Sequence, residues 1–425
     1  MIKNLLKHSL RSLKKQKGYV FINILGLSIG IACSLIITLF VIHQLSYDQY
    51  HTKKERLYRL VLDGKIGDQE LMTSSSAAVI GPTMVIDFPE VESVNRINFV
   101  GETIIKKGDQ NYVISDCMES DSLFFDLFSI PLLKGDKKSV LNSPNAIVLS
   151  ETTANLIFGD EDPINKMVKI NTRQDPFIIT GVMADVLENT HFNADLITSF
   201  ITNPRSQDPE WLNNSFNTYV LLKPNTNPEN VNAKFPGMIE KYIGPRVLQL
   251  FGVSISEFLE QGNRYNFRLQ SISKIHHDPT ILDGAKPASD PKYLIIFGSI
   301  AILIIVIASI NFMNLSTAQA TKRAKEVGIK KVSGSSRGAL ISQFLSDSTI
   351  ISFIALILAV IIVWVAMPFF NNLLNADVPF NLFSNWYSIP ILIGFSIFVG
   401  ILAGAYPAFY LSSFNPNAVL RGKVR

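Results

Sequence analysis

Four long apolar runs constrain the fold of this chain more than any other feature of its sequence. They are Tyr19–Ile42, Tyr293–Ala318, Ile341–Met367 and Ile389–Leu411. A helix of about 20 apolar residues crosses the ~30 Å hydrocarbon core of a bilayer, and each run reaches that length. The sequence therefore predicts a multispan α-helical membrane protein with four transmembrane helices.

The segment before the first run is basic and amphipathic. In Met1–Lys17, apolar residues recur at helical spacing on one face and lysines lie mainly on the other. This pattern is typical of a helix at an anionic membrane surface. The rival interpretation is a cleaved signal peptide, whose apolar region is usually only ~7–15 residues long. Because Tyr19–Ile42 is longer, we interpret it as a retained membrane anchor.

The interval between the first two runs is polar and mixes strand and helix signals. Strands are predicted at 56–62, 145–149, 177–182 and 218–222, and helices at 76–88, 150–158 and 229–242. Asn, Pro and Gly turns separate these elements, and Ser150 has the side chain of a helix N-cap. The pattern predicts a large α+β extracytoplasmic domain inserted between spans 1 and 2.

Orientation follows from the charged loops. Lysine and arginine are dense in three short segments: Met1–Lys17, Thr321–Arg337 and Arg421–Arg425. Such segments stay in the cytoplasm, so we expect both termini inside and 44–291 outside. Asp347 begins the third run and is expected near the lipid headgroups, because an acid at the bilayer centre costs ~2.5–3.5 kcal/mol.

These expectations divide the chain into consecutive segments. They are a cytoplasmic amphipathic helix at 1–17, transmembrane helix 1 at 18–43, the extracytoplasmic domain at 44–291, transmembrane helix 2 at 292–318, a cytoplasmic coupling segment at 319–340, transmembrane helix 3 at 341–367, a short outer loop at 368–388, transmembrane helix 4 at 389–412 and a cytoplasmic tail at 413–425.

Small residues mark one side of the first span. Gly26, Gly30 and Ser34 are spaced by four and would form a smooth stripe. Such a stripe lets a second helix approach closely, although glycine is also common in membrane helices without this role. The stripe concerns helix packing and not chemistry.

No motif predicts an enzyme. A Gly-x-x-x-x-Gly-Lys-Ser/Thr phosphate loop does not occur in the sequence, so nucleotide hydrolysis by that device is not expected. His276, His277 and Asp278 are adjacent, but neighbouring histidines on a strand point to opposite faces and no second cluster completes a metal site. We therefore expect no catalytic residues, no metal and no cofactor in this chain.

The second apolar run continues into a basic amphipathic segment. Its candidate coupling residues are Lys322, Arg323, Lys325, Glu326, Val327, Gly328, Ile329, Lys330, Lys331 and Gly334. Lysines after a span also occur as a plain stop signal, which requires charge only. Here Val327 and Ile329 are interleaved with the charges, and Gly334 follows as a helix terminator. The segment suits a groove on a partner protein as well as a lipid surface.

This segment and the order of the spans resemble the MacB/FtsX-type permease subunits of ABC transporters, a family that includes the LolC/LolE group. Residues 323–334, RAKEVGIKKVSG, are similar to the family pattern R-x-K/R-E-[VI]-G-[IV]-R-K-x-x-G, with Lys330 in place of the usual Arg. Asn311–Thr317, Leu45–Asp48 and Leu57–Arg59 are also similar to the family. The resemblance covers nearly the whole chain.

The resemblance implies a permease that transmits the motion of a separate ABC ATPase dimer to the extracytoplasmic domain (mechanotransmission), with ATP and magnesium only in that partner. It implies a second permease copy or homologous half, a periplasmic adaptor or outer-membrane partner, and a place in the bacterial inner (plasma) membrane. The spans and the uneven charge themselves predict contact with membrane lipid and no nucleic acid. Export or release of amphiphilic peptides, lipoproteins or toxic compounds (efflux) is the expected function. The alternatives are a transmitter that activates a cell-wall hydrolase, as in FtsX, and a sensor without an ATPase.

Overall fold

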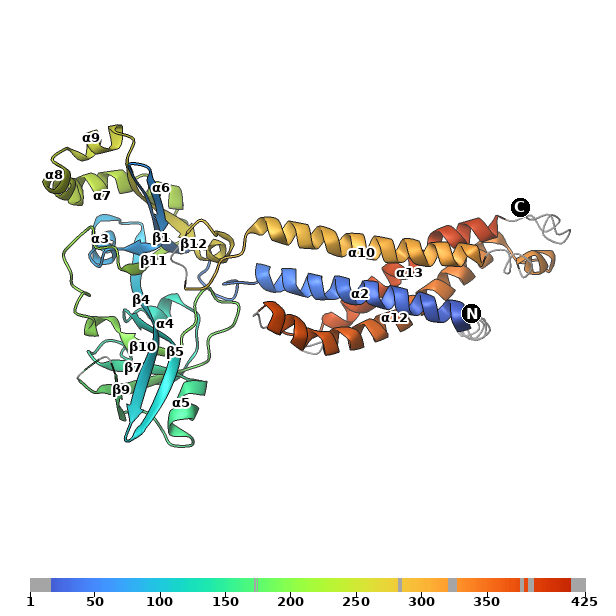
Figure 1. Ribbon diagram of the computed structural model, residues 1–425, viewed down its shortest axis with the longest axis horizontal. Helices are drawn as coiled ribbons and strands as arrows, with labels where there is room; N and C mark the ends of the chain where they lie inside the picture. The colour runs from blue at the N-terminus through green and yellow to red at the C-terminus, as the bar shows by residue number, and fades with distance from the viewer. Residues whose placement is uncertain are drawn as a thin grey trace. The chain divides into compact units, whose positions relative to one another are not determined.

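The computed structural model describes residues 17–171, 173, 175–281, 285–319, 327–374, 378–380 and 386–413. The chain divides into two compact units, which are labelled by element in Figure 1. One unit, the outer domain, is Ser46–Pro291, and the other, the membrane unit, comprises the segments before and after it. Residues 1–16 of the predicted surface helix and residues 414–425 of the tail lie outside the described residues.

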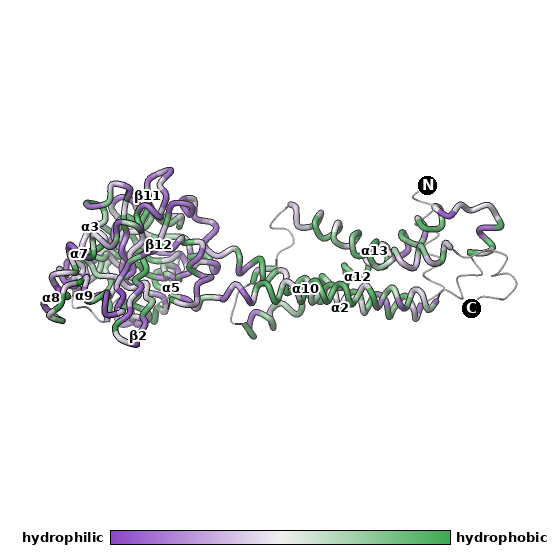
Figure 2. The backbone as a smooth tube through the Cα atoms, turned by 90° about the horizontal axis from the view of Figure 1, so that it is seen from above, coloured by the Kyte–Doolittle hydropathy of each residue, from purple (hydrophilic) through white to green (hydrophobic). Residues whose placement is uncertain are grey.

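The membrane unit contains four long helices. They are α2 (Lys17–Leu45), α10 (Pro291–Ala318), α12 (Arg337–Leu374) and α13 (Ser388–Ser412). Each is long and apolar enough to cross a membrane, and Figure 2 shows hydrophobic colouring along most of their length. The predicted fold class, four spans with a mixed α and β domain between the first and second, is confirmed.

Helix α12 extends beyond the predicted third run at both ends. It starts at Arg337 and continues through Pro368 to Leu374. A proline removes one backbone donor, and membrane helices tolerate this where neighbouring groups compensate. An apolar run marks only the most hydrophobic part of a helix, so the residues of α12 before Ile341 and after Met367 were not predicted.

The membrane helices pack around a shared apolar core. Leu27 and Ile31 of α2 lie with Ala355 and Ala359 of α12 and Val399 of α13, all nearly inaccessible to solvent. Membrane helices associate by close packing, since lipid is as apolar as their side chains. The alanines allow the backbones to approach at this position.

The outer domain is built on one twelve-stranded sheet. Its strands are β1 (Leu57–Ile66), β2 (Gln69–Thr73), β3 (Ser75–Ser76), β4 (Val91–Lys107), β5 (Gln110–Ser120), β6 (Leu132–Lys134), β7 (Ala146–Ser150), β8 (Met167–Ile170), β9 (Phe177–Met183), β10 (Leu196–Ser199), β11 (Phe216–Leu222) and β12 (Arg264–Ser271). The main path is β12-β1-β11-β4-β5-β10-β7-β9-β6. Only β5–β10 and β7–β9 pair in parallel among the described strands.

Short helices cover the sheet. They are α3 (Ile80–Asp87), α4 (Phe124–Leu127), α5 (Glu151–Phe158), α6 (Pro228–Asn232), α7 (Phe235–Tyr242), α8 (Gly244–Phe251) and α9 (Ile255–Glu260), with 3₁₀ turns η1 (Phe200–Thr202) and η2 (Ile272–His277). Ser150 caps α5 as predicted, because its hydroxyl accepts the Thr153 N–H at 3.2 Å. The single helix predicted at 229–242 is wrong: Pro236 lacks an N–H, and the segment forms α6 and α7 instead.

Two apolar layers hold β1, the first strand after α2, and β12, the last strand before α10. On one side, Leu60, Val220 and Phe267 pack with α3 and α7 through Met84 and Phe235. A second layer is formed by a ring cluster around Tyr219, including Phe124, Phe128 and Phe192. Strands β11, β1 and β12, which are neighbours in the sheet, therefore have a closely packed environment.

Candidate coupling site

The coupling segment is described from Val327 onward, and residues 327–332 are helical. Val327 is 2% exposed and packs with Leu340 and Phe344 of α12 and Ala408 and Leu411 of α13. A buried valine held between two helices fixes the start of this segment to the bundle. A displacement of the segment is therefore resisted by both spans.

The other apolar side chains of the segment are exposed. Ile329 is 53% and Val332 67% accessible, while Lys330 Nζ donates to Gln343 Oε1 of α12 at 3.1 Å. Gly328 is buried, and Lys331 is half-buried. The described part of the segment thus has one anchored side and one free apolar edge beside its lysines.

A Schellman motif ends this helix at Gly334. The N–H of Gly334 donates to the Lys331 carbonyl, and the N–H of Ser335 donates to the Lys330 carbonyl, each at 3.0 Å. Gly334 has φ +90°, a conformation that costs other residues more than glycine. The predicted Lys322, Arg323, Lys325 and Glu326 lie outside the described residues.

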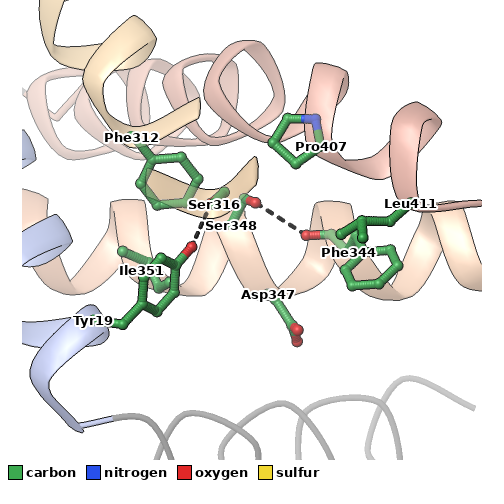
Figure 3. A pocket seen from close by; sticks show the side chains of 9 residues that line it. All are labelled: Tyr19, Phe312, Ser316, Phe344, Asp347, Ser348, Ile351, Pro407 and Leu411. Carbon is green, nitrogen blue, oxygen red and sulfur yellow. Dashed lines mark hydrogen bonds between the residues drawn. The ribbon is translucent and has the colours of Figure 1, made fainter. Parts of the chain in front are cut away.

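A small polar pocket lies among the spans, and Figure 3 shows its lining. Tyr19 of α2 and Ser316 of α10 share a hydrogen bond, and Ser348 of α12 donates to the Phe344 carbonyl at 3.0 Å. Asp347 is in the same lining and is only 3% exposed. The pocket volume is about 10 Å³, about the room one water requires.

Asp347 is therefore a buried acid within the membrane unit. Acidic side chains in membrane segments normally face the bundle interior, where polar groups offset the cost of burial. The position of Asp347 near the headgroups stays a prediction, and Tyr19, Ser316 and Ser348, which line the same pocket, were not predicted. The signal that could have suggested this polar pocket is that Ser316 and Ser348 interrupt apolar runs of the sequence.

The glycine stripe of α2 faces α10. A Cβ added at Gly30 would lie 2.6 Å from the Ala308 Cβ, and one at Gly26 would lie 3.3 Å from the Asn311 amide nitrogen. Ser34 is buried. Contacts under 3.0 Å are not tolerated by real Cβ atoms, so glycine at position 30 is needed for this approach.

A second close approach, which the sequence did not predict, joins α12 and α13. A Cβ at Gly400 would lie 2.7 Å from the Thr349 Cα, and one at Gly404 would lie 2.6 Å from the Ser348 Cβ. The Ser352 hydroxyl also donates to the Ser396 carbonyl at 2.9 Å. Small residues and an interhelical hydrogen bond thus hold the two spans that anchor Val327.

The adjacent histidines of the outer domain lie on the 3₁₀ turn η2 and not on the predicted strand. His276 stacks on Tyr47, with ring centroids 3.4 Å apart. Asp278 bonds Thr280, Gln270 and Arg268. Within the described ranges, no group of three or more His, Cys, Asp or Glu side chains could hold a metal ion.

Comparisons with known proteins agree with this architecture. The family model described as MacB-like periplasmic core domain matches residues 20–237, which is half of the chain, and FtsX-like permease C-terminal matches residues 298–416. The first match ends inside α7, so α8 and α9 lie beyond it.

Curated relatives are distant in sequence. The macrolide export ATP-binding/permease protein MacB of Bdellovibrio bacteriovorus is 23% identical, over 64% of this chain and 38% of that protein. The ABC transporter permease YvrN of Bacillus subtilis is 24% identical, over 71% of this chain and 68% of its own length. The match to MacB of Mannheimia succiniciproducens covers 44% of that protein, so the chain spans less than half the length of these two MacB proteins.

Among solved structures, a domain of a putative permease from Porphyromonas gingivalis is 20% identical with a TM-score of 0.45, covering 57% of this chain and 95% of that one. The periplasmic region of MacB from Actinobacillus actinomycetemcomitans is 17% identical with a TM-score of 0.35, covering 52% and 90%. With both family models in the order of the two units, the chain belongs to the MacB/FtsX-type permeases of ABC transporters.

Proposed function

We propose that this chain is a permease subunit that transmits the ATP-driven motion of a separate ABC ATPase to its outer domain, for export or release of amphiphilic substrates. The observation that carries the proposal is the divided role of the short helix at 327–332. Val327 is buried between α12 and α13, whereas Ile329 and Val332 are exposed. A partner that binds the exposed edge can move two spans through the buried anchor.

The ATPase is the partner that the family supports. An exposed apolar pair beside Lys330 and Lys331 suits a groove with an acidic rim, since buried apolar anchors carry most binding energy and charges add specificity. ATP and magnesium would then bind only in that subunit. A dimeric ATPase would require a second permease copy or a homologous half, and the three basic segments would face the cytoplasm with residues 44–291 on the outside.

Export is favoured over activation of a cell-wall hydrolase by the relatives, which are named for macrolide export. Amphiphilic compounds are the substrate class we propose, and a periplasmic adaptor or outer-membrane partner would receive them. Capture of a hydrolase by the full-length chain, with no export phenotype on deletion, would instead support the FtsX-like alternative.

Copurification of the tagged full-length chain with its ATPase tests whether the exposed edge formed by Ile329 and Val332 binds the ATPase. Replacing both Ile329→Glu and Val332→Glu should reduce the recovered ATPase at least ten-fold, because interface anchors are often worth ~2 kcal/mol or more each. Ser333→Glu is the matched control: it adds a carboxylate at an exposed position of the same segment and removes no apolar side chain. Equal ATPase recovery with all variants would overturn the assignment.

The anchor is tested separately. Val327→Ala should leave ATPase recovery intact but reduce substrate export, because the cavity loosens the hold of α12 and α13 on the segment. Normal export by a folded Val327→Ala protein would contradict the transmission route.

A further inference from the structure

A line of buried polar side chains crosses the outer domain between the two segments that lead to the membrane helices. We call these two segments the tethers. Asp48 follows the end of α2 at Leu45, and Asp278 lies between β12 and the start of α10. Four side chains connect them, and three come from neighbouring strands: His191, Tyr219 of β11, Arg59 of β1 and Gln270 of β12. We call these six residues the tether lock.

Hydrogen bonds join the neighbours in the tether lock, except that Tyr219 and Arg59 are joined by an electrostatic interaction. The Asp48 carboxylate is 2.8 Å from His191 Nδ1, and His191 Nε2 is 2.8 Å from the Tyr219 hydroxyl. The Arg59 guanidinium acts electrostatically on the Tyr219 hydroxyl. Arg59 donates to Gln270 Oε1 at 2.7 Å, and Gln270 Nε2 donates to Asp278 Oδ2 at 3.0 Å.

The protonation states of Asp48 and His191 determine which group donates and which accepts in each hydrogen bond of this line. Burial lowers the pKa of His191, although Asp48 opposes the shift, so the imidazole is neutral. It donates from Nδ1 to the Asp48 carboxylate and accepts from Tyr219 at Nε2. Burial alone would raise the pKa of Asp48, but His191 and His51 hold it well below its usual range. The line therefore joins an anion, Asp48, to a cation, Arg59, through neutral side chains.

Burial makes these bonds difficult to exchange with water. Asp48, His191, Arg59, Tyr219 and Gln270 are all less than 5% exposed. A buried polar group that loses its partner bears its full desolvation penalty. We therefore expect the hydrogen bonds of the tether lock to form together and to break together.

The segment after α2 forms a second set of hydrogen bonds with the loop that carries His191. Asp48 has φ +58°, unusual for a residue with a side chain, and its N–H donates to the Asn189 carbonyl at 2.8 Å. The Asn189 amide donates to the Ser46 carbonyl at 3.1 Å, and Tyr50 bonds Thr190 at 2.9 Å. This loop therefore holds the chain directly after the first span.

The segment before α10 reaches the same loop. Lys286 Nζ donates to the Glu188 carbonyl at 2.9 Å, and the ring of His276 stacks on that of Tyr47. Both tethers are thus hydrogen-bonded to residues 188–191. Through the tether lock they also connect to the three adjacent strands β11, β1 and β12.

We propose that the tether lock makes the two tethers and the sheet move as one body, so that a displacement of the first or second span tilts the outer domain and is not absorbed by its linkers. The inference rests on the proposed function for its use, but the joint itself is testable without an ATPase. A flexible linker between span and domain would dissipate a small helix shift, whereas a buried joint held by several hydrogen bonds passes it on.

Hydrogen–deuterium exchange of the full-length protein in nanodiscs tests the joint. Tyr219→Phe removes one hydroxyl from the middle of the tether lock and keeps the ring in its apolar cluster. Exchange should rise about ten-fold at both distant ends, residues 46–51 and 272–281, because loss of one buried hydrogen bond releases the line.

Ser76→Ala is the matched control. Its buried hydroxyl bonds Thr218 at 2.7 Å and the Phe216 carbonyl at 3.0 Å on the same strand β11, outside the tether lock. Its effect should stay near β3 and β11. If Tyr219→Phe leaves both ends protected, or if Ser76→Ala opens them equally, the tether lock is an ordinary part of the core and the proposal is wrong.

A second measurement addresses transmission. Spin labels at Asp68→Cys and Asn372→Cys, in a Cys33→Ser background, report the distance between the outer domain and α12 with and without ATP in the complex with the ATPase. Tyr219→Phe should lose most of the ATP-dependent change while the Ser76→Ala protein keeps it. An unchanged response in Tyr219→Phe overturns the joint, whereas absence of any bound ATPase or any response in the unsubstituted protein overturns the proposed function instead.

Discussion

At the scale of single residues, the structure separates anchoring from exposed side chains within one short motif. Val327, Ile329 and Val332 have the same apolar character in the sequence, yet only Val327 is buried. Periodicity identified the motif and its glycine terminator, but it could not assign the buried side, because that depends on α12 and α13. The same limit applies to Asp48 and His191, which are bonded across 143 residues of sequence.

The buried His191 predicts a pH dependence. Its pKa is lowered by burial in the folded protein, whereas an unfolded histidine titrates near ~6.5. A group with a depressed folded pKa contributes its full stability above the unfolded pKa and loses it as the pH falls through the folded pKa. The thermal midpoint of the outer domain in the full chain should therefore fall as the pH drops from about 7 to about 5.

His191 faces Asp48, His51, Arg59 and Tyr219, and Asp48 stays ionised throughout this range because its pKa is held low. Scanning fluorimetry of the unsubstituted protein and of His191→Gln is the appropriate measurement. The variant should be less stable at neutral pH but flatter in its pH response. If the thermal midpoints of the two proteins fall equally steeply with pH, a group other than His191 controls the pH dependence in this range.

Cys117 provides a reactivity prediction. Burial, with help from Asp195 and Asp116, raises the pKa of its thiol to about 12. Because the thiolate is the nucleophile, iodoacetamide at mild alkaline pH should leave Cys117 unmodified in the folded protein and modify it in denaturant. Ser143→Cys, exposed in the same domain, is the control that should react in both conditions. Peptide mass spectrometry measures the outcome, and rapid labelling of folded Cys117 would contradict its burial.

At the scale of elements, backbone approach decides which helices are tightly joined. Glycines at 394 and 400 look alike in the sequence of α13, but only a Cβ at position 400 would meet α12. The two sites therefore have opposite tolerance for a side chain.

Gly400→Leu should lower the thermal midpoint of the detergent-solubilised protein by several degrees, because forcing a side chain against the Thr349 backbone costs ~1–3 kcal/mol. Gly394→Leu, which has nothing within 4 Å of its added Cβ, should leave the midpoint nearly unchanged. Size-exclusion profiles after heating measure both variants. Equal midpoints would mean that α12 and α13 do not approach here.

At the scale of the whole molecule, the arrangement of loops predicts opposite sides for the two halves of the proposed mechanism. Basic segments retained in the cytoplasm would include Ser333, and the outer domain would include Asp68. In a Cys33→Ser background, a membrane-impermeant maleimide should label Asp68→Cys on intact spheroplasts and Ser333→Cys only after lysis. Labelling of both positions on intact spheroplasts would reject the topology and with it the coupling proposal.

The sequence by itself determined the four spans, the position of the inserted domain and the family, because apolar length, charge asymmetry and a contiguous motif are all local properties of the chain. It also predicted the Ser150 cap, since a cap needs only neighbouring residues. Tertiary structure alone decided the single continuous sheet, the Tyr19–Ser316 pair, the α12–α13 approach at Gly400 and the tether lock. These features depend on partners far apart in sequence, and no periodic pattern records which distant side chain will be the neighbour.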